Sequence, residues 1–184
     1  MGFLSRKQLN QIGFATVGEN VLISDKCSIY NPQKIVIGSN VRIDDFCILS
    51  AGDGGIIIGN YVHIACYVSL IGAETIKVSD FVGISSRTAV YSSSDDYSGN
   101  NLVGPTIPSI FKKVDNRKVT FEKLSLIGAN CVILPGVIVG EGTAVGALSL
   151  VIRTLEPWGI YIGNPLKFIK PRSKKMIDYL QHFS

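Results

Sequence analysis

The sequence contains little histidine, little charge and no long apolar run. Its 184 residues include two histidines, His63 and His182, and charged residues make up 17% of the chain. A zinc hydratase with three histidine ligands is therefore excluded, because the chain cannot supply them. No apolar run reaches the roughly 20 residues that cross a membrane. With a net charge of +4 and no basic run, the chain also lacks the pattern of a nucleic-acid-binding protein.

Two further absences concern processing and metal chemistry. The first residues, MGFLSRKQLNQIG, lack the apolar stretch of a secretory signal, so we expect a cytoplasmic protein. The cysteines show no metal-ligand spacing, and we expect neither a metal site nor a disulfide. We interpret all four as small apolar side chains in the core: Cys27, Cys47, Cys66 and Cys131.

An aliphatic side chain does recur at every sixth position. From Ile127 the series continues with Ile133, Val139, Val145 and Val151. A helix repeats every 3.6 residues and a strand every two, so neither element produces a period of six. A triangular solenoid does, because each hexad forms one short face and turns its aliphatic residue inward. The period therefore predicts an all-β fold, a parallel β-helix.

The same period runs through most of the chain, and its offsets predict which side chains share a column. Similar segments begin at Ile37, Ile58 and Val78, which are 21 and 20 residues apart. Three hexads make one coil of about 18 residues. Because the observed offsets exceed this length, the extra residues predict a small bulge at one corner of each coil. Stacking by these offsets predicts an outward column of Arg42, His63 and Gly83. It also predicts a corner column of Asp53, Glu74 and Ser94.

Three segments fall outside the repeat within this single domain. Residues 1–16 are expected to cap one end of the solenoid, with Ser5 starting a helix. Residues 94–126 contain Gly104-Pro105 and little periodicity, and a loop of that length in a compact fold is usually functional. Residues 171–184 predict a C-terminal helix that caps the other end. Its apolar side is formed by Met176, Ile177, Leu180 and Phe183.

Two motifs narrow the function. The stretch VYSSSDD, from Val90 to Asp96, ends one coil and opens the long loop, and the chain closes with GIYIGNPLKFIK. Together with the hexads, they resemble the hexapeptide-repeat acyltransferases, most of all the sugar acetyltransferases of bacterial surface-polysaccharide (lipopolysaccharide) synthesis and the galactoside and maltose acetyltransferases. The resemblance covers roughly Val17 to Arg172. It implies a left-handed β-helix, acetyl-CoA as acyl donor, and a homotrimer with active sites between subunits.

The same resemblance assigns residues to acetyl-CoA. The pantetheine arm is expected to pass Ala129 and Ala147, where a small side chain lets the arm reach backbone groups. Arg153, Lys167 and Lys170 stand where the family carries basic residues. Fixed cations at these positions would bind the phosphates of CoA.

The chain departs from the family at the general base. The family places a histidine at the start of the long loop, and here that position falls on Asp95. A carboxylate is the weaker base, with a pKa of roughly 4 against about 6.5 for imidazole. A hydroxyl acceptor needs early deprotonation, whereas an uncharged amine attacks by itself. Asp95 therefore favours an amino sugar as acceptor. A simpler interpretation is that Asp95 only forms an Asx turn in the loop.

Other side chains compete for this role or support it. Asp96 and Tyr97 are further candidates for holding the acceptor or its proton. Glu74 and Ser94, from the corner column next to Asp95, are candidates for contacting the substrate. His63 points outward in its column, so it could reach the cleft of a neighbouring subunit and act as the base; the simpler reading is an exposed or interface histidine.

The sequence thus predicts an acetyl-CoA-dependent acetyltransferase that N-acetylates a nucleotide-linked amino sugar. Two alternatives stay open. One is a sugar O-acetyltransferase with His63 as base. The other is a non-catalytic β-helix that serves as an interaction scaffold. The absence of a histidine at position 95 supports this alternative.

Overall fold

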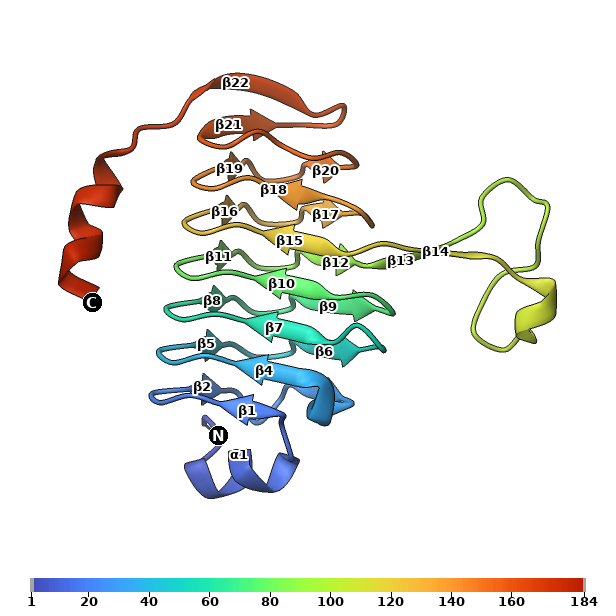
Figure 1. The fold of residues 1–184 in the computed structure, drawn as a ribbon, viewed down its shortest axis with the longest axis horizontal. Coiled ribbons are helices and arrows are strands. Elements are labelled where there is room, and N and C mark those ends of the chain that lie inside the picture. Colours follow the sequence, from blue (N-terminus) through green and yellow to red (C-terminus); the bar gives the residue numbers. More distant parts are fainter. Residues whose placement is uncertain (1, 184) are drawn as a thin grey trace.

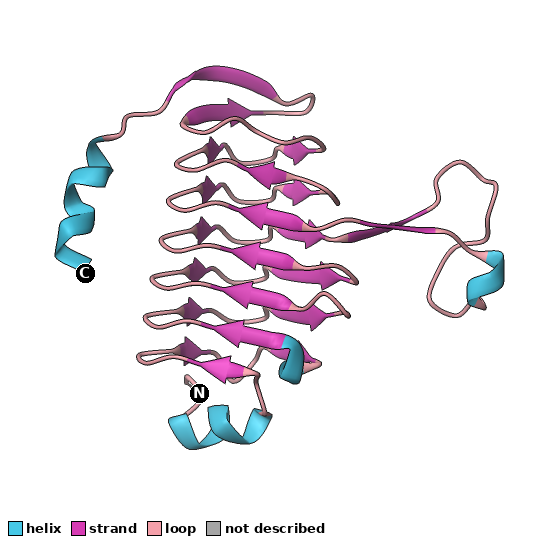
Figure 2. Ribbon diagram, in the orientation of Figure 1, coloured by secondary structure: helices cyan, strands magenta, loops and turns pink. Residues whose placement is uncertain are grey.

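The computed structural model is a three-sided parallel β-helix, described for residues 2–183 (Figures 1 and 2). Met1 and Ser184, the outermost residues of the predicted cap and C-terminal helix, lie outside the described residues. In Figure 1 the front strands run leftward while the chain rises from N to C, and the strands behind run back to the right. This winding is left-handed, as predicted. No helix among the described residues is long and apolar enough to span a bilayer.

Each side of the triangle is one sheet, to which nearly every coil adds one short strand. The first sheet contains β1 (Thr16–Val17), β4 (Ile35–Ile37), β7 (Ile56–Ile58), β10 (Ile76–Val78), β15 (Val119–Phe121) and β18 (Ile138–Val139). The second contains β2 (Leu22–Ile23), β5 (Arg42–Ile43), β8 (His63–Ile64), β11 (Gly83–Ile84), β16 (Leu126–Ile127), β19 (Ala144–Val145), β21 (Gly159–Ile162) and β22 (Lys167–Pro171). The third contains β3 (Ser28–Tyr30), β6 (Ile48–Ala51), β9 (Ser69–Gly72), β12 (Ala89–Tyr91), β17 (Val132–Ile133) and β20 (Leu150–Val151).

The core is a column of aliphatic side chains inside the triangle. The five aliphatic residues that are spaced six apart are at most 2% exposed: Ile127, Ile133, Val139, Val145 and Val151. The hexad prediction is therefore confirmed. Cys47 and Cys131 are buried as predicted. Cys27 is only partly buried but packs against the core, whereas Cys66 is partly buried and not part of the core, so the prediction is wrong for Cys66.

The corner between the second and third sheets, called here the 2–3 corner, is a stack of equivalent turns. In the turns that follow β5, β8, β11, β16 and β19 one residue has a left-handed backbone, among them Phe46 at φ 62° and Tyr67 at φ 62°. The turns are joined by backbone hydrogen bonds, such as that from the amide of Tyr67 to the carbonyl of Asp45 at 3.0 Å. Since neighbouring strands lie about 4.8 Å apart, side chains at the same turn position form straight columns along this corner.

The N-terminal end is covered as predicted. Helix α1 (Arg6–Ile12) begins after Ser5, whose hydroxyl accepts a hydrogen bond from the amide of Gln8. The Gln8 side chain in turn accepts from the amide of Ser5 at 2.9 Å, which completes a capping box. Leu9, on the inner side of the helix, is buried against the first coil.

The C-terminal end differs from the prediction. The last coil is covered by β22, which pairs antiparallel with β21 and occupies the open edge of the second sheet. The predicted helix is a 3-10 helix, η3 (Lys175–Phe183), and it does not cap the end. It lies back along the side of the solenoid (Figure 1), where the ring of Phe183 contacts Tyr61 and Phe81 at centroid distances of 5.1 and 5.3 Å.

The long excursion leaves from the corner between the third and first sheets, called here the 3–1 corner. Strands β13 (Ser93–Asp95) and β14 (Val114–Asn116) form an antiparallel ribbon, with η2 (Ser109–Phe111) beyond it. We call residues 93–118 the arm; it projects away from the solenoid in Figure 1. The predicted loop end at residue 126 is wrong, because Val119 already pairs with Ile76 in the first sheet. Another short 3-10 helix, η1 (Pro32–Lys34), lies at the same corner three coils nearer the N-terminus, between β3 and β4.

Replacing Ile64 with alanine should lower the free energy of unfolding by about 2–5 kcal/mol, because its fully buried side chain would leave a cavity. The matched control is Ile57→Ala, which removes the same atoms from an outward position that is 40% exposed. That variant should cost less than about 1 kcal/mol. Urea unfolding followed by circular dichroism measures both, and equal losses would contradict the inward and outward alternation described above.

Candidate active site and cofactor groove

Asp95 lies at the base of the arm, where β13 leaves the coil. A pocket of about 400 Å³ opens beside it. The pocket is lined by Tyr91, Ser93, Ser94, Asp95, Tyr97, Val132 and Leu134. The Asp95 carboxylate is exposed and forms no hydrogen bond or ion pair with any of residues 2–183. It is therefore available to accept a proton from a molecule bound in the pocket.

Asp96, the neighbouring candidate, has a different environment. Its carboxylate accepts hydrogen bonds from the side chain of Asn101 at 2.7 Å and from the amide and hydroxyl of Ser98 at 2.8 and 2.9 Å. These bonds lower the pKa of Asp96 to about 2. The Asx turn considered for Asp95 is thus formed by Asp96, which holds the arm together and is poorly suited to act as a base.

The three candidates for contacting substrate separate in space. Ser94 and Tyr97 line the Asp95 pocket, and Tyr97 is 94% exposed. Glu74 does not line it: its side chain is exposed, and its carbonyl accepts from the hydroxyl of Ser92 at 2.5 Å. The predicted corner column is wrong at Ser94, because β13 pairs with β14 of the arm and not with the coil below.

His63 is placed as the offsets predicted, next to Arg42 and Gly83 in an outward column of the second sheet. Its Nε2 atom lies 2.8 Å from Asp44, whose other carboxylate oxygen accepts from Nε of Arg42 at 2.7 Å. Partial burial opposes ionisation of Asp44, but these hydrogen bonds outweigh it and lower its pKa. His63 lies on a different side of the triangle from Asp95, so one chain does not bring the two together.

The predicted cofactor residues lie towards the C-terminal end of the solenoid. Ala129 and Ala147 occupy successive turns of the 2–3 corner, where the amide of Leu148 donates to the carbonyl of Ala129 at 2.9 Å. Arg153 lines a pocket of about 300 Å³ together with Asn164, Pro165 and Leu166 of the closing motif, with Leu150 of β20, and with Ile152, which follows that strand. The structure therefore places Arg153 beside the GNP-x-K segment.

The two predicted lysines of this region lie on β22 and are exposed. Lys167 directly follows the pocket residue Leu166, and Lys170 lies beside Ile160 in the antiparallel pair. Arg172, by contrast, has a structural role. Its guanidinium donates to the carbonyls of Leu124 and Gly142 at 3.0 and 2.9 Å, and burial lowers its pKa.

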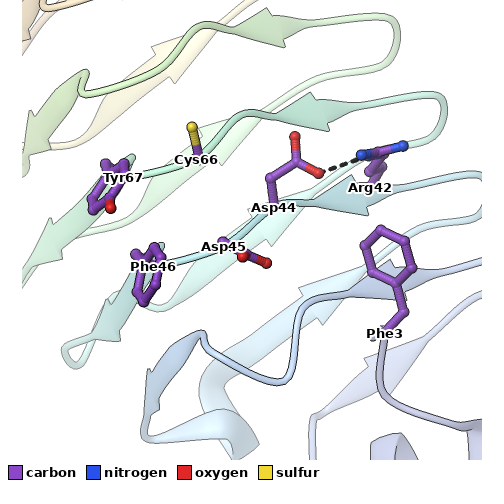
Figure 3. A pocket seen from close by; sticks show the side chains of 7 residues that line it. All are labelled: Phe3, Arg42, Asp44, Asp45, Phe46, Cys66 and Tyr67. Atoms are coloured by element: carbon purple, nitrogen blue, oxygen red, sulfur yellow. Dashed lines mark hydrogen bonds and ion pairs between the residues drawn. The ribbon is translucent and has the colours of Figure 1, made fainter. Parts of the chain in front are cut away.

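A further pocket, of about 440 Å³, lies on the 2–3 corner nearer the N-terminus (Figure 3). It is lined by Phe3, Arg42, Asp44, Asp45, Phe46, Cys66 and Tyr67. The hexad pattern does not predict this pocket. A signal was present, because Phe46 and Tyr67 are one coil offset apart, and the structure stacks their rings at 5.0 Å.

No protein-family profile matches the chain. It is 47% identical over 178 residues to dTDP-4-amino-4,6-dideoxy-D-glucose acyltransferase of Escherichia coli, an alignment that covers 97% of this chain and 93% of that enzyme. The fold matches AntD, an N-acyltransferase from Bacillus cereus solved with dTDP and 3-hydroxybutyryl-CoA, with a TM-score of 0.95 at 52% identity over 99% and 96% of the two chains. The chain belongs to the hexapeptide-repeat acyltransferases. The predicted family and the left-handed β-helix are confirmed.

Further solved structures are similar to this hexapeptide-repeat acyltransferase. AntD has also been solved with dTDP-4-amino-4,6-dideoxyglucose and coenzyme A, in a variant with one serine replaced, and in variants with one aspartate replaced by alanine or asparagine. A maltose O-acetyltransferase from Clostridium difficile matches with a TM-score of 0.58 at 17% identity, over 91% and 74% of the two chains. A likeness at that identity shows the shared fold alone.

Proposed function

We propose that this enzyme transfers an acyl group, acetyl in the simplest case, from coenzyme A to the amine of a dTDP-linked 4-amino-4,6-dideoxy sugar. The observation that carries the proposal is the unpartnered carboxylate of Asp95 in the pocket at the base of the arm. The nearly full-length identity to an acyltransferase named for such a sugar supports the acceptor. No zinc or other metal takes part in the proposed chemistry.

Asp95 is the proposed base. The amine attacks the thioester carbonyl, a C–N bond forms, and the C–S bond then breaks to release the CoA thiolate. Asp95 accepts the proton that the attacking nitrogen loses, and that proton is returned to the sulfur. Backbone amides of the coil would stabilise the negative charge that develops on the carbonyl oxygen. Ser94 and Tyr97 orient the acceptor. Glu74 does not line the pocket, and Asp96 holds the arm together.

The coenzyme would lie along the 2–3 corner. The pantetheine arm passes Ala147 and Ala129, whose small side chains leave the backbone of the turns accessible. The phosphates lie near Arg153, which lines the C-terminal pocket, and near Lys167 and Lys170, which are exposed on the strand that follows the pocket residue Leu166. None of these three cations forms an ion pair with residues 2–183. Charge-assisted contacts of this kind are the stronger class of hydrogen bond.

We further propose a homotrimer with active sites between subunits. Asp95 leaves from the 3–1 corner while the alanines lie on the 2–3 corner, so a second copy is needed to bring the base to the cofactor. The arm also carries apolar side chains that nothing in the described chain covers, such as Tyr97 at 94% and Ile110 at 82% exposure. Such side chains suit contact with a neighbouring subunit. The enzyme would work in the cytoplasm, in surface-polysaccharide (lipopolysaccharide) synthesis.

Asp95→Asn should lower kcat/KM for the amino sugar by about 100-fold or more, because the amide cannot accept the proton. Asp96→Asn, the matched control on the next residue, and His63→Ala should leave kcat within a few-fold. Free thiol released from acetyl-CoA reports turnover, with hydroxyl sugars as comparison acceptors. Loss of turnover in the His63 variant alone would identify His63 as the base and favour O-acetylation.

Arg153→Ala and Lys167→Ala should each weaken CoA binding by roughly 10-fold, the loss of about one charge-assisted contact. Lys7→Ala removes the same charge from the exposed side of α1 and should have no effect. Isothermal titration with CoA measures the three dissociation constants. A chain that bound no CoA at all would instead be the non-catalytic scaffold.

Mixing two inactive variants should restore activity if sites are shared between subunits. Asp95→Asn removes the base, and Ala147→Leu fills the path of the pantetheine arm. Co-refolded mixtures then contain sites with an intact base from one chain and an intact groove from another. Light scattering should give the mass of three chains, and a mixture that stays inactive despite forming trimers would place each site within one chain.

A further inference from the structure

The last residue of each turn at the 2–3 corner directs its side chain towards the core. From the N-terminal end, these residues form one column: Cys27, Cys47, Val68, Thr88, Cys131 and Ser149. From Cys47 onward every member of the column is at most 2% exposed. Because Cys27 and Cys47 are consecutive members, the column places two cysteines side by side in neighbouring coils.

Cys27 is the accessible member of this pair. It directly precedes β3, the edge strand of the third sheet, so no coil lies on its other side. Its side chain packs against the core but is only partly buried, whereas Cys47 is fully buried. A small solute can therefore reach the sulfur of Cys27 and not that of Cys47.

The two cysteines are close enough to form a disulfide. Strands β3 and β6 pair in register, and the amide of Ser28 donates to the carbonyl of Cys47 at 2.9 Å. Neighbouring Cα atoms in such a pair are about 4.8 Å apart, within the roughly 4.4–6.8 Å that a disulfide spans. The Cys27 thiol already leans towards the next coil and donates to the carbonyl of Asp44 at 3.2 Å. Turning the Cys47 thiol away from the carbonyl of Ala65, to which it donates at 3.1 Å, brings the two sulfurs together.

The two thiols differ in reactivity. Hydrogen bonding from Cys47 lowers the pKa of Cys27, and this effect outweighs partial burial and the nearby charge of Asp45. The same contact and then burial raise the pKa of Cys47. Cys131 occupies the same column without a neighbouring cysteine, and burial raises its pKa. Since the thiolate is the nucleophile, Cys27 is the member of the pair that reacts first.

We propose that Cys27 is a peroxide-reactive thiol and that Cys47 resolves its oxidised form, giving a reversible disulfide between the first two coils. The Cys27 thiolate attacks hydrogen peroxide, the O–O bond breaks, and the departing hydroxide takes up a proton, which leaves a sulfenic acid. The Cys47 sulfur then attacks the Cys27 sulfur. An S–S bond forms, the S–O bond breaks, and the oxygen leaves as water with the Cys47 proton. Two thiols are thus oxidised while one peroxide is reduced to two waters.

This disulfide would fasten the coil that has a neighbour on one side alone. Neither cysteine lines the pocket beside Asp95, so the modification site is separate from the proposed acyl transfer. A loop of this length, closed by a disulfide, stabilises the folded chain chiefly by restricting the unfolded chain. The melting temperature of the oxidised protein should therefore be higher than that of the reduced protein by about 5–10 °C.

The test treats the full reduced chain with hydrogen peroxide, followed by digestion and mass spectrometry without a reductant. A peptide that joins Cys27 to Cys47 is expected, and a thiol reductant should release it. Cys27→Val and Cys47→Val should each abolish this peptide and the rise in melting temperature. Cys131→Val, the matched control in the same column, should keep both. Valine suits these positions because Val68 occupies the same place in the turn and is fully buried.

A second measurement separates the two roles. In Cys47→Val the oxidised Cys27 has no resolving partner, so dimedone, which reacts with sulfenic acids, should label Cys27 there and not in the unchanged chain. If peroxide leaves Cys27 reduced in the folded chain, or oxidises Cys66 first, Cys27 is not the reactive thiol. If Cys27 is labelled in the unchanged chain and never joined to Cys47, the resolving role of Cys47 is wrong.

Discussion

Parallel stacking of the coils is the constraint on which the rest of the molecule depends. Each strand hydrogen-bonds to the equivalent strand of the next coil, and each coil adds aliphatic side chains to one continuous core. The spacing between coils is therefore set by the backbone, at about 4.8 Å. Residues that are far apart in the sequence, such as Asp45 and Ala147, are therefore aligned along one edge by the backbone, and no direct contact between them is needed.

The sequence was sufficient where a property follows from this repeat. The period of six predicts the inward residues, and the offsets of 20 and 21 correctly predict that Arg42, His63 and Gly83 share a column. The cap at Ser5 was also predictable, because its hydrogen bonds are local. The same offsets bring Phe46 and Tyr67 together, so that the aromatic pair was within reach of the sequence as well.

The sequence was insufficient where the chain leaves the repeat. The return at Val119 lacks a full hexad before it, so only pairing with Ile76 identifies it as part of the coil. The path of η3 depends on Phe183 finding Tyr61 and Phe81 more than 100 residues earlier. The roles of Asp95 and Asp96 are likewise decided by Ser98 and Asn101, whose hydrogen bonds engage one carboxylate and leave the other free. Residue type alone does not reveal which of two adjacent aspartates has the free carboxylate.

The reversed direction of β22 has a consequence for association. A parallel solenoid that ended on an uncovered coil would expose unpaired backbone amides and carbonyls. The first coil of another chain could hydrogen-bond to them, and repeated pairing of this kind would give fibres. Here the final strand runs the opposite way, and the opposite end is closed by α1. The two terminations do not match each other, so neither end presents the strand register that end-to-end growth of such a solenoid would need.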